Sequence, residues 1–209
     1  MSRLTVIQHP LLEHKLTILR CASTPSSLFR QTLREASWLL GYEATRHLNL
    51  IEENIETPLE PMTARSLPEL TPCLISILRA GNGITDGFMD LIPEAPVGHL
   101  GLARNPKTLL PEEYYCKLPT DVDKRQTILA DPMLATGGST IAAIQSLYQA
   151  GVTDLIFACL VASPEGVAAL QESYPDVPIF VGVLDRELND KGYILPGLGD
   201  AGDRIYGTA

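Results

Sequence analysis

Five short apolar runs restrict the fold of this chain more than any other feature of its sequence. They cover residues 73–78, 97–102, 128–130, 155–161 and 179–184. Continuous apolar runs of this length are typical of strands that are buried on both faces, as in parallel sheets. Helical patterns lie between the runs, so we predict an α/β fold with a mainly parallel twisted sheet flanked by helices.

A length of 209 residues fits one domain of ordinary size. We expect residues 1–209 to form that single domain in three parts. These are an N-terminal helical segment (1–72), a core (73–190) with a polar β-hairpin arm or flap at about 105–126, and an irregular C-terminal segment (191–209).

The N-terminal segment gives a weaker signal than the core. Residues 25–53 predict one long helix or two, with Ser26 or Ser27 as the N-cap. The apolar stripe is formed by Leu28, Leu33, Ala36, Leu39 and Leu40. Residues 54–72 contain four prolines, which indicates an extended connection that could include an edge strand.

Residues 127–140 combine a short strand, a glycine turn and the start of a helix. The strand ends at Asp131, small residues fill 135–140, and Ile141, Ile144 and Leu147 follow at helical spacing. Such a joint directs backbone N–H groups and a helix dipole at one point, which suits a phosphate. No Lys follows the glycines, and their spacing does not fit a dinucleotide fingerprint.

Asp131 indicates which type of phosphorylated ligand the turn would bind. A carboxylate is a poor phosphate ligand but a good acceptor for the vicinal hydroxyl groups of a sugar. Asp131 together with the turn at 136–140 therefore indicates a ribose 5-phosphate. The alternative is an ordinary strand–turn–helix joint of an α/β protein.

Arginines follow two other predicted strands. Arg79 comes directly after 73–78 and precedes Ala80 and Gly81, and Arg104 lies just beyond 97–102. Ligands in open α/β sheets bind at the carboxyl ends of strands, so both cations are candidates for contact with an anion. A structural turn with a solvated arginine is the alternative for Arg79.

The last 19 residues contain five glycines and one proline, which excludes a long helix or a central strand. A frayed terminus is one interpretation. We favour an ordered segment, because its apolar side chains could anchor it while the glycines let the main chain approach a ligand. These side chains are Ile194, Leu195, Leu198 and Ile205.

Composition excludes several classes of function. The net charge of −9 argues against nucleic acid, which usually binds a basic surface. No apolar run approaches the ~20 residues that span a membrane, and residues 1–10 lack the apolar core of a signal peptide, so we expect a cytoplasmic protein. The four cysteines and four histidines are scattered, so no protein metal site is expected, and Cys73 and Cys159 are assigned to the core.

The run Asp-Pro-Met-Leu-Ala-Thr-Gly-Gly-Ser at 131–139 resembles the phosphoribosyl-diphosphate motif of type I phosphoribosyltransferases. Its form is that of the uracil phosphoribosyltransferase family, in which proline, here Pro132, replaces the second of two acids. Ile-Leu-Arg-Ala-Gly at 77–81 resembles the family's pyrophosphate loop, and residues 192–204 resemble its uracil-binding signature. The resemblance runs from about His9 to Thr208.

The resemblance implies the type I phosphoribosyltransferase fold and a reaction of pyrimidine salvage. Uracil and 5-phospho-α-D-ribose 1-diphosphate would give UMP and diphosphate. Mg²⁺ would be bound mainly through the diphosphate and ribose oxygens of the substrate. A non-proline cis peptide is expected next to Arg79.

The resemblance also implies a set of site residues. Arg104 and Asp200 are the candidate catalytic residues. The candidate uracil contacts are Ile194, Gly199, Asp200 and Ala201. The candidate contacts to phosphoribosyl diphosphate are Arg79, Arg104, Asp131, Pro132, Met133, Leu134, Ala135, Thr136, Gly137, Gly138, Ser139 and Asp200.

Members of this family are often homodimers or homotetramers, and some respond to GTP, so both are expectations here. The sequence departs from the family at Asn82, where an apolar residue is usual, and at Cys116, where a polar one is common. Two alternatives remain at this point: an RNA-binding pyrimidine regulator of the same fold, and an inactive paralogue. The net charge of −9 and the complete uracil signature disfavour the regulator.

Overall fold

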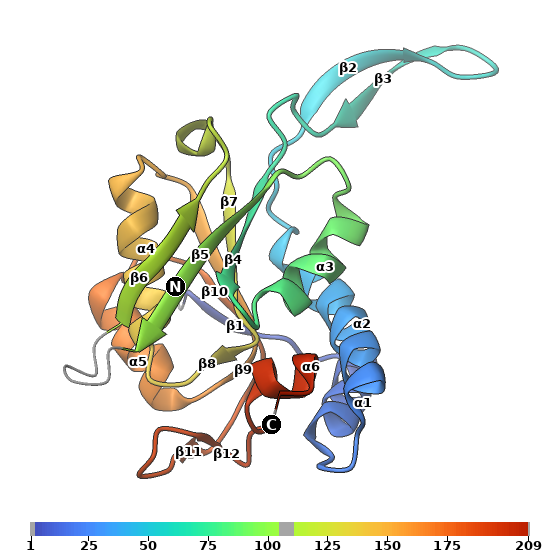
Figure 1. Ribbon diagram of the computed structural model, residues 1–209. Helices are drawn as coiled ribbons and strands as arrows, with labels where there is room; N and C mark the ends of the chain where they lie inside the picture. Colours follow the sequence, from blue (N-terminus) through green and yellow to red (C-terminus); the bar gives the residue numbers. More distant parts are fainter. Residues whose placement is uncertain (1–2, 105–110, 209) are drawn as a thin grey trace.

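The computed structural model describes residues 3–104 and 111–208. Its centre is an eight-stranded sheet in the order β1-β10-β9-β7-β4-β5-β6, with β8 beside β9 (Figure 1). The strands are β1 (Leu4–Val6), β4 (Cys73–Leu78), β5 (Val97–Arg104), β6 (Pro111–Lys117), β7 (Thr127–Ala130), β8 (Met133–Leu134), β9 (Leu155–Ala162) and β10 (Ile179–Leu184). Only the pairing of β5 with β6 is antiparallel in this sheet. The predicted mainly parallel sheet is confirmed.

Helices cover both faces of the sheet. One face packs on α1 (Pro10–Arg20), α2 (Ser26–Ala44) and α3 (Asn82–Leu91), and the other on α4 (Gly138–Gln149) and α5 (Pro164–Ser173). Neighbouring strand residues alternate between the two cores: Leu74 faces α1–α3, whereas Ile75 faces α4 and α5. Cys73 and Cys159 are buried, as predicted.

The predicted helix over residues 25–53 is correct only for its first part. Helix α2 ends at Ala44, and residues 51–56 form a strand instead. The predicted serine cap is also wrong, because Pro25 occupies the N-cap position and Ser26 is the first helical residue. Leu33, Ala36 and Leu40 of the predicted stripe are buried, whereas Leu28 is exposed.

Residues 51–66 form a separate two-stranded hairpin of β2 (Ile51–Glu56) and β3 (Pro61–Ser66). The hairpin projects from the body of the molecule (Figure 1). The proline-rich segment is extended, as predicted, but it pairs with the residues before it and not with an edge of the central sheet. Most side chains of β2 and β3 are exposed, so the sequence of these strands shows no pattern of buried apolar residues.

The polar segment predicted as a β-hairpin arm or flap contributes an edge strand to the central sheet. Strand β6 pairs antiparallel with β5, with His99 opposite Lys117. Residues 112–117 are exposed, which explains their polar composition. A short 3₁₀ helix, η1 (Val122–Lys124), leads back to β7, and residues 105–110 lie outside the described part of the chain.

Two N-terminal elements were not predicted. Residues 10–20 form α1, whose N-cap His9 accepts a hydrogen bond from the Leu11 N–H at its Nδ1 over 3.2 Å. Strand β1 pairs with β10 at the edge of the sheet. Among the helices of residues 3–104 and 111–208, none has the length and apolar character needed to cross a membrane.

Candidate active site

Three neighbouring strands end beside one another at the edge of the sheet that also carries the C-terminal segment (Figure 1). Strands β7, β4 and β5 are adjacent in the sheet, and Asp131, Arg79 and Arg104 stand at their carboxyl ends. The backbone therefore places these three strand ends side by side. The side chain of Arg104 lies outside the described part of the chain.

The turn after β7 has the geometry of an anion site. Gly137 is the N-cap of α4 with φ of 83°, a left-handed conformation that glycine adopts without strain. No side chain of the described residues caps this helix, so N–H groups of its first turn remain available to a ligand. A hollow lies beside this turn. Its lining residues are Asp131, Met133, Ala135, Thr136, Gly137, Gly138, Ser139 and Thr140.

Contacts with the start of α5 hold the turn at residues 135–140 in place. Ser163 Oγ donates a hydrogen bond to the Ala135 carbonyl over 2.6 Å and accepts one from the Gly166 N–H over 2.9 Å. Gly166 packs so closely that a Cβ on it would lie 2.2 Å from the Ala135 oxygen. Ser163 is also the N-cap of α5, a role that its sequence neighbourhood indicates, whereas its bond to the turn joins segments far apart in the chain.

Asp131 is a partly buried carboxyl group at the base of this hollow. Burial is the main cause that raises its pKa from the ordinary value to about 7; the hydrogen bond from the Met133 N–H opposes this shift, and the nearby charge of Asp200 contributes to it. Because the charge of Asp200 acts on Asp131, the C-terminal segment lies close to the end of β7. A cation bound beside the two carboxyl groups would favour their ionised forms.

Arg79 stands on the loop between β4 and α3. The peptide bond between Leu78 and Arg79 is cis, as predicted. The Arg79 guanidinium is more than half exposed, lies over the Tyr206 ring at 5.6 Å and contacts Asp203 Oδ1 at 3.3 Å. Such loose contacts leave it free to turn toward an anion.

Two glycines, Gly81 and Gly202, let the Arg79 loop pack closely against neighbouring segments. A Cβ on Gly81 would lie 2.7 Å from the Ala130 oxygen, so the loop packs directly on the end of β7. A Cβ on Gly202 would lie 3.3 Å from Asp200 Oδ1 and 3.7 Å from Arg79 Nη2. Arg79 and Asp200 therefore approach a common point.

Asn82, which departs from the family pattern, has a structural role here. It is the first residue of α3, and its Oδ1 accepts a hydrogen bond from the buried Ser76 hydroxyl over 2.8 Å. The polar side chain satisfies a hydroxyl group that would otherwise be buried without a partner.

The C-terminal segment is ordered and packed. Strands β11 (Glu187–Leu188) and β12 (Ile194–Leu195) pair as a small hairpin, and a short helix, α6 (Ala201–Tyr206), follows. Ile194, Leu198 and Ile205 are buried, which rejects a frayed terminus for these residues. Gly199 has φ of 81°, and Asp200 caps α6 by accepting the Asp203 N–H at Oδ1 over 2.9 Å.

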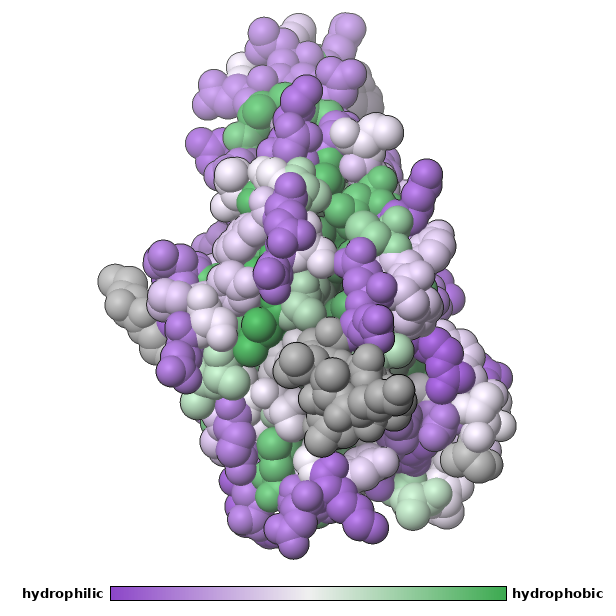
Figure 2. Space-filling model, turned by 60° about the vertical axis from the view of Figure 1, so that its left-hand side comes forward, coloured by the Kyte–Doolittle hydropathy of each residue, from purple (hydrophilic) through white to green (hydrophobic). Residues whose placement is uncertain are grey.

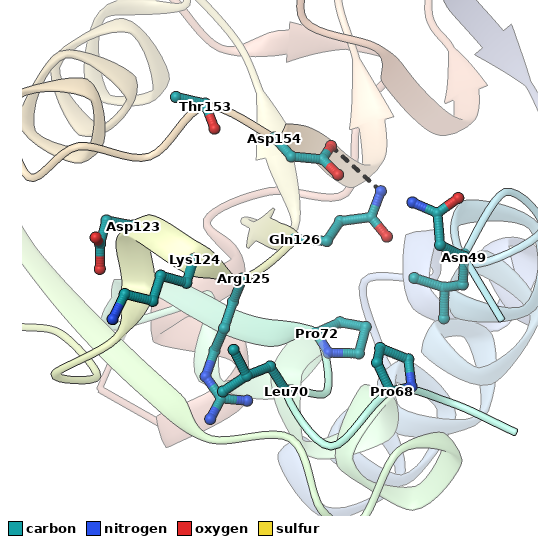
Figure 3. Close-up of a pocket in the computed structure, with 11 residues that line it drawn as sticks. Asn49, Pro68, Leu70, Pro72, Asp123, Lys124, Arg125, Gln126, Thr153 and Asp154 are labelled. Atoms are coloured by element: carbon teal, nitrogen blue, oxygen red, sulfur yellow. Dashed lines mark hydrogen bonds between the residues drawn. The ribbon is translucent and has the colours of Figure 1, made fainter. Parts of the chain in front are cut away.

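A second hollow lies at the opposite edge of the sheet, near the base of the β2–β3 hairpin (Figure 3). Three of its polar side chains, those of Arg125, Gln126 and Asp154, are engaged in hydrogen bonds within the protein. Gln126 donates to Asp154 over 3.3 Å, and Arg125 donates to the Thr71 carbonyl over 2.7 Å. It also lies at the amino ends of the strands, where α/β sheets seldom bind ligands. We therefore assign the site to the carboxyl edge.

The comparison with known families agrees with this geometry. Residues 6–208 match the family model described as uracil phosphoribosyltransferase. The chain belongs to the uracil phosphoribosyltransferase family. A relative of that name from Alkaliphilus oremlandii is 54% identical over 208 residues, which cover 100% of both chains. One from Paracoccus denitrificans is 54% identical over 207 residues, which cover 99% of this chain and 98% of the relative.

Solved structures show the same fold. The AQ2163 protein from Aquifex aeolicus has a TM-score of 0.93 and 37% identity, with 99% of each chain covered. An adenine phosphoribosyl transferase from Trypanosoma brucei has a TM-score of 0.58 and 12% identity, with 92% of this chain and 88% of that chain covered. The second structure shows that proteins outside the uracil phosphoribosyltransferase family share this type I phosphoribosyltransferase fold.

Proposed function

We propose that the protein transfers the 5-phosphoribosyl group of 5-phospho-α-D-ribose 1-diphosphate to N1 of uracil, in pyrimidine salvage. The bond from ribose C1 to the diphosphate breaks, the bond from C1 to N1 forms, and the products are UMP and diphosphate. The observation that carries the proposal is the meeting of the phosphate turn after β7, Asp131 and the C-terminal segment at one edge of the sheet.

Each part of phosphoribosyl diphosphate has a candidate partner in this arrangement. The N–H groups of the turn at 135–139 suit the 5-phosphate, because they are backbone donors at a helix N-terminus. Asp131 would accept the ribose hydroxyl groups, and Pro132 to Leu134 would support the sugar site from the segment that pairs with β9. Arg79 and Arg104 would meet the diphosphate.

Uracil would be read by backbone groups of the C-terminal segment. Its O2, N3–H and O4 present an acceptor–donor–acceptor row, which N–H and C=O groups near Ile194, Gly199 and Ala201 could match. Cytosine presents a different row and would leave polar groups unpaired, which makes discrimination large. Ile194 and Ala201 are buried, so the protein interior holds this segment in place, which supports this role.

The chemistry requires no protein nucleophile. Breaking the C1–diphosphate bond builds positive charge on the sugar and negative charge on the leaving group, so positioning and charge stabilisation are the main contributions. Arg104 would act on the leaving diphosphate. Asp200 would support the cationic sugar or orient the metal-bound substrate, and its position beside Asp131 and Arg79 supports that assignment.

Mg²⁺ is part of the proposal. Within the described residues, no cluster of three or more His, Cys, Asp or Glu side chains could hold a metal. Asp131 and Asp200 supply carboxylate oxygens, and Mg²⁺ commonly takes one or two carboxylates together with substrate phosphates. Bound in this way, the ion would neutralise charge on the diphosphate.

Self-association, a GTP effector and a cytoplasmic location are further parts of the proposal. The projecting β2–β3 hairpin supports self-association, because it exposes Ile51, Ile55, Leu59 and Met62 away from any core of its own. In Figure 2 it stands at the top, mainly hydrophilic with a few hydrophobic residues among the polar ones. A dimer or tetramer is expected in solution.

The experiment is an assay with purified protein, Mg²⁺, phosphoribosyl diphosphate and each base, run with and without GTP. We expect UMP from uracil and no nucleotide from cytosine, adenine or guanine. Folded protein that forms no UMP under either condition would refute the proposal. Salt-dependent binding of RNA by such a protein would favour the regulator instead.

A further inference from the structure

A largely buried ion pair contacts the C-terminal segment. Asp185 directly follows β10 and is 8% exposed. Arg20 is the last residue of α1, and its guanidinium bonds both carboxylate oxygens: Nη1 to Oδ2 over 2.9 Å and Nη2 to Oδ1 over 2.6 Å. The pair joins the N-terminal helix to the carboxyl edge of the sheet.

The same two side chains hold both backbone polar groups of Gly197. The Gly197 N–H donates to Asp185 Oδ2 over 2.9 Å, and the Gly197 carbonyl accepts from Arg20 Nη1 over 2.7 Å. Gly197 has φ of 62°, and a Cβ there would lie 2.2 Å from the Ile194 oxygen. The peptide units on either side of Gly197 therefore have one orientation.

Gly197 lies between the backbone groups that we assign to uracil. Ile194 precedes it, and Gly199 and Ala201 follow. Arg20 lines the same hollow as Gly199. A rotation of the peptide units at Gly197 would turn the following N–H and C=O groups away from the base.

Arg204 supports the turn from its other side. Its guanidinium donates to the Leu198 carbonyl over 2.8 Å and to the Cys21 carbonyl over 2.6 Å, and it stacks on Phe29 at 4.4 Å. It also donates to the Leu19 carbonyl. The end of α1 therefore holds residues 197 and 198 through two arginines.

The energetics of the pair favour a geometric role. Removing two charges from water offsets much of their attraction, so a buried ion pair adds little net stability. The pair instead fixes the orientation of the groups bonded to it, because a guanidinium bonds a carboxylate in a fixed plane.

We propose that Arg20 and Asp185 are positioning residues that orient the base-recognition turn, residues 197–201, and so set the affinity for uracil without contacting it. The inference rests on the proposed function, since it assumes that this turn binds uracil. It assigns no part to the pair in binding phosphoribosyl diphosphate.

A second arginine in the chain offers a matched control. Arg125 bonds Asp121 through Nε and Nη2 over 2.9 and 2.7 Å and donates to the Thr71 carbonyl over 2.7 Å. It too is a mostly buried guanidinium that joins a carboxylate to a backbone carbonyl. It lines the hollow of Figure 3, at the amino ends of the strands. Arg125→Lys therefore measures the general cost of such a change.

The test compares Arg20→Lys, Asp185→Asn, their double variant and Arg125→Lys. Lysine keeps the charge but cannot bond both carboxylate oxygens and the Gly197 carbonyl together. We expect both Arg20→Lys and Asp185→Asn to raise KM for uracil roughly tenfold or more, the size expected for losing a charged hydrogen bond. KM for phosphoribosyl diphosphate should change less than about twofold, and the double variant should resemble the single ones. Arg125→Lys should leave both KM values unchanged at a similar loss of Tm.

Three results would overturn the inference. The first is an equal rise of both KM values in Arg20→Lys. The second is the same pattern in Arg125→Lys. The third is loss of the folded circular dichroism spectrum in both Arg20→Lys and Asp185→Asn, which would make the pair structural. If the unaltered protein forms no UMP, the proposed function has failed instead.

Discussion

Ser163 Oγ lies 2.6 Å from the carbonyl oxygen of Ala135 and donates a hydrogen bond to it. Ser163, the N-cap of α5, thereby fixes the turn that precedes α4. Ser163 is fully buried, and its own N–H donates to the Leu134 carbonyl over 2.9 Å. The shape of the phosphate turn thus depends on a helix that contributes no residue to the turn itself.

Ser163→Ala tests this dependence. The variant loses the α5 cap and leaves the Ala135 carbonyl without its partner, so we expect about 1–2 kcal/mol lower stability. In a chain of this size that lowers Tm by roughly 2–4 °C per kcal/mol. KM for phosphoribosyl diphosphate should rise, because the turn is no longer fixed.

His9→Ala is the matched control for Ser163→Ala. It removes the side-chain cap of α1, which is far from the phosphate turn in sequence and on the other face of the sheet. Its Tm should fall while KM for phosphoribosyl diphosphate stays unchanged. Equal KM changes in the two variants would contradict the role of Ser163.

Asp131→Asn should separate stability from function. The pKa of Asp131 is raised from its ordinary value to about 7, so the protonated form suits the fold better than the ionised form. Stability from the protonated group is present below about pH 4 and is lost as pH rises to about 7. A neutral asparagine avoids this loss.

We therefore expect the Tm of Asp131→Asn to exceed that of the unaltered protein by more at pH 8 than at pH 5, in thermal melts without substrate. Binding of phosphoribosyl diphosphate with Mg²⁺ should weaken in the variant, because the ribose hydroxyl groups lose a charged acceptor. A Tm difference that does not depend on pH would contradict the environment described for Asp131.

Arg79→Ala should lower activity without lowering stability. The guanidinium is 56% exposed and its contact with Asp203 is at the surface, so its loss costs little folding free energy. Loss of a donor to the leaving diphosphate should raise the barrier by roughly 3 kcal/mol, a fall in kcat/KM of about a hundredfold. Arg3→Ala, which removes an exposed ion pair with Asp176, is the control and should keep full activity.

Gly81→Ala should disturb the packing between two strand ends. The new Cβ would lie 2.6 Å from the Ile77 oxygen and 2.7 Å from the Ala130 oxygen. Neither backbone group can move without shifting β4 or β7, so we expect a loss of about 1–3 kcal/mol in urea unfolding. Unchanged stability would show that the Arg79 loop is not packed on β7.

The sequence predicted the parts of the fold that are buried on both sides. Strands such as β4 and β9 appear as continuous apolar runs because helices cover both faces of the sheet. Strands β2, β3 and β6 have mostly exposed side chains and therefore carry no such signal. The predicted helix over residues 25–53 includes β2, because the exposed side chains of that strand give no sign that the helix has ended at Ala44.

The candidate site divides in a similar way. Asp131 and Arg79 were predicted because each directly follows an apolar strand, a local pattern. The Ser163–Ala135 and Arg20–Asp185 contacts were not, since they join residues 28 and 165 positions apart. Only the packing of helices on the sheet brings such residues together.

A crystal structure of the protein with UMP tests most directly whether one edge of the sheet binds both halves of the product. We predict that the phosphate lies on the turn at 135–139, the ribose hydroxyl groups on Asp131, and the uracil edge on backbone groups between Ile194 and Ala201. UMP bound elsewhere, such as in the hollow of Figure 3, or with its base away from the C-terminal segment, would contradict the account.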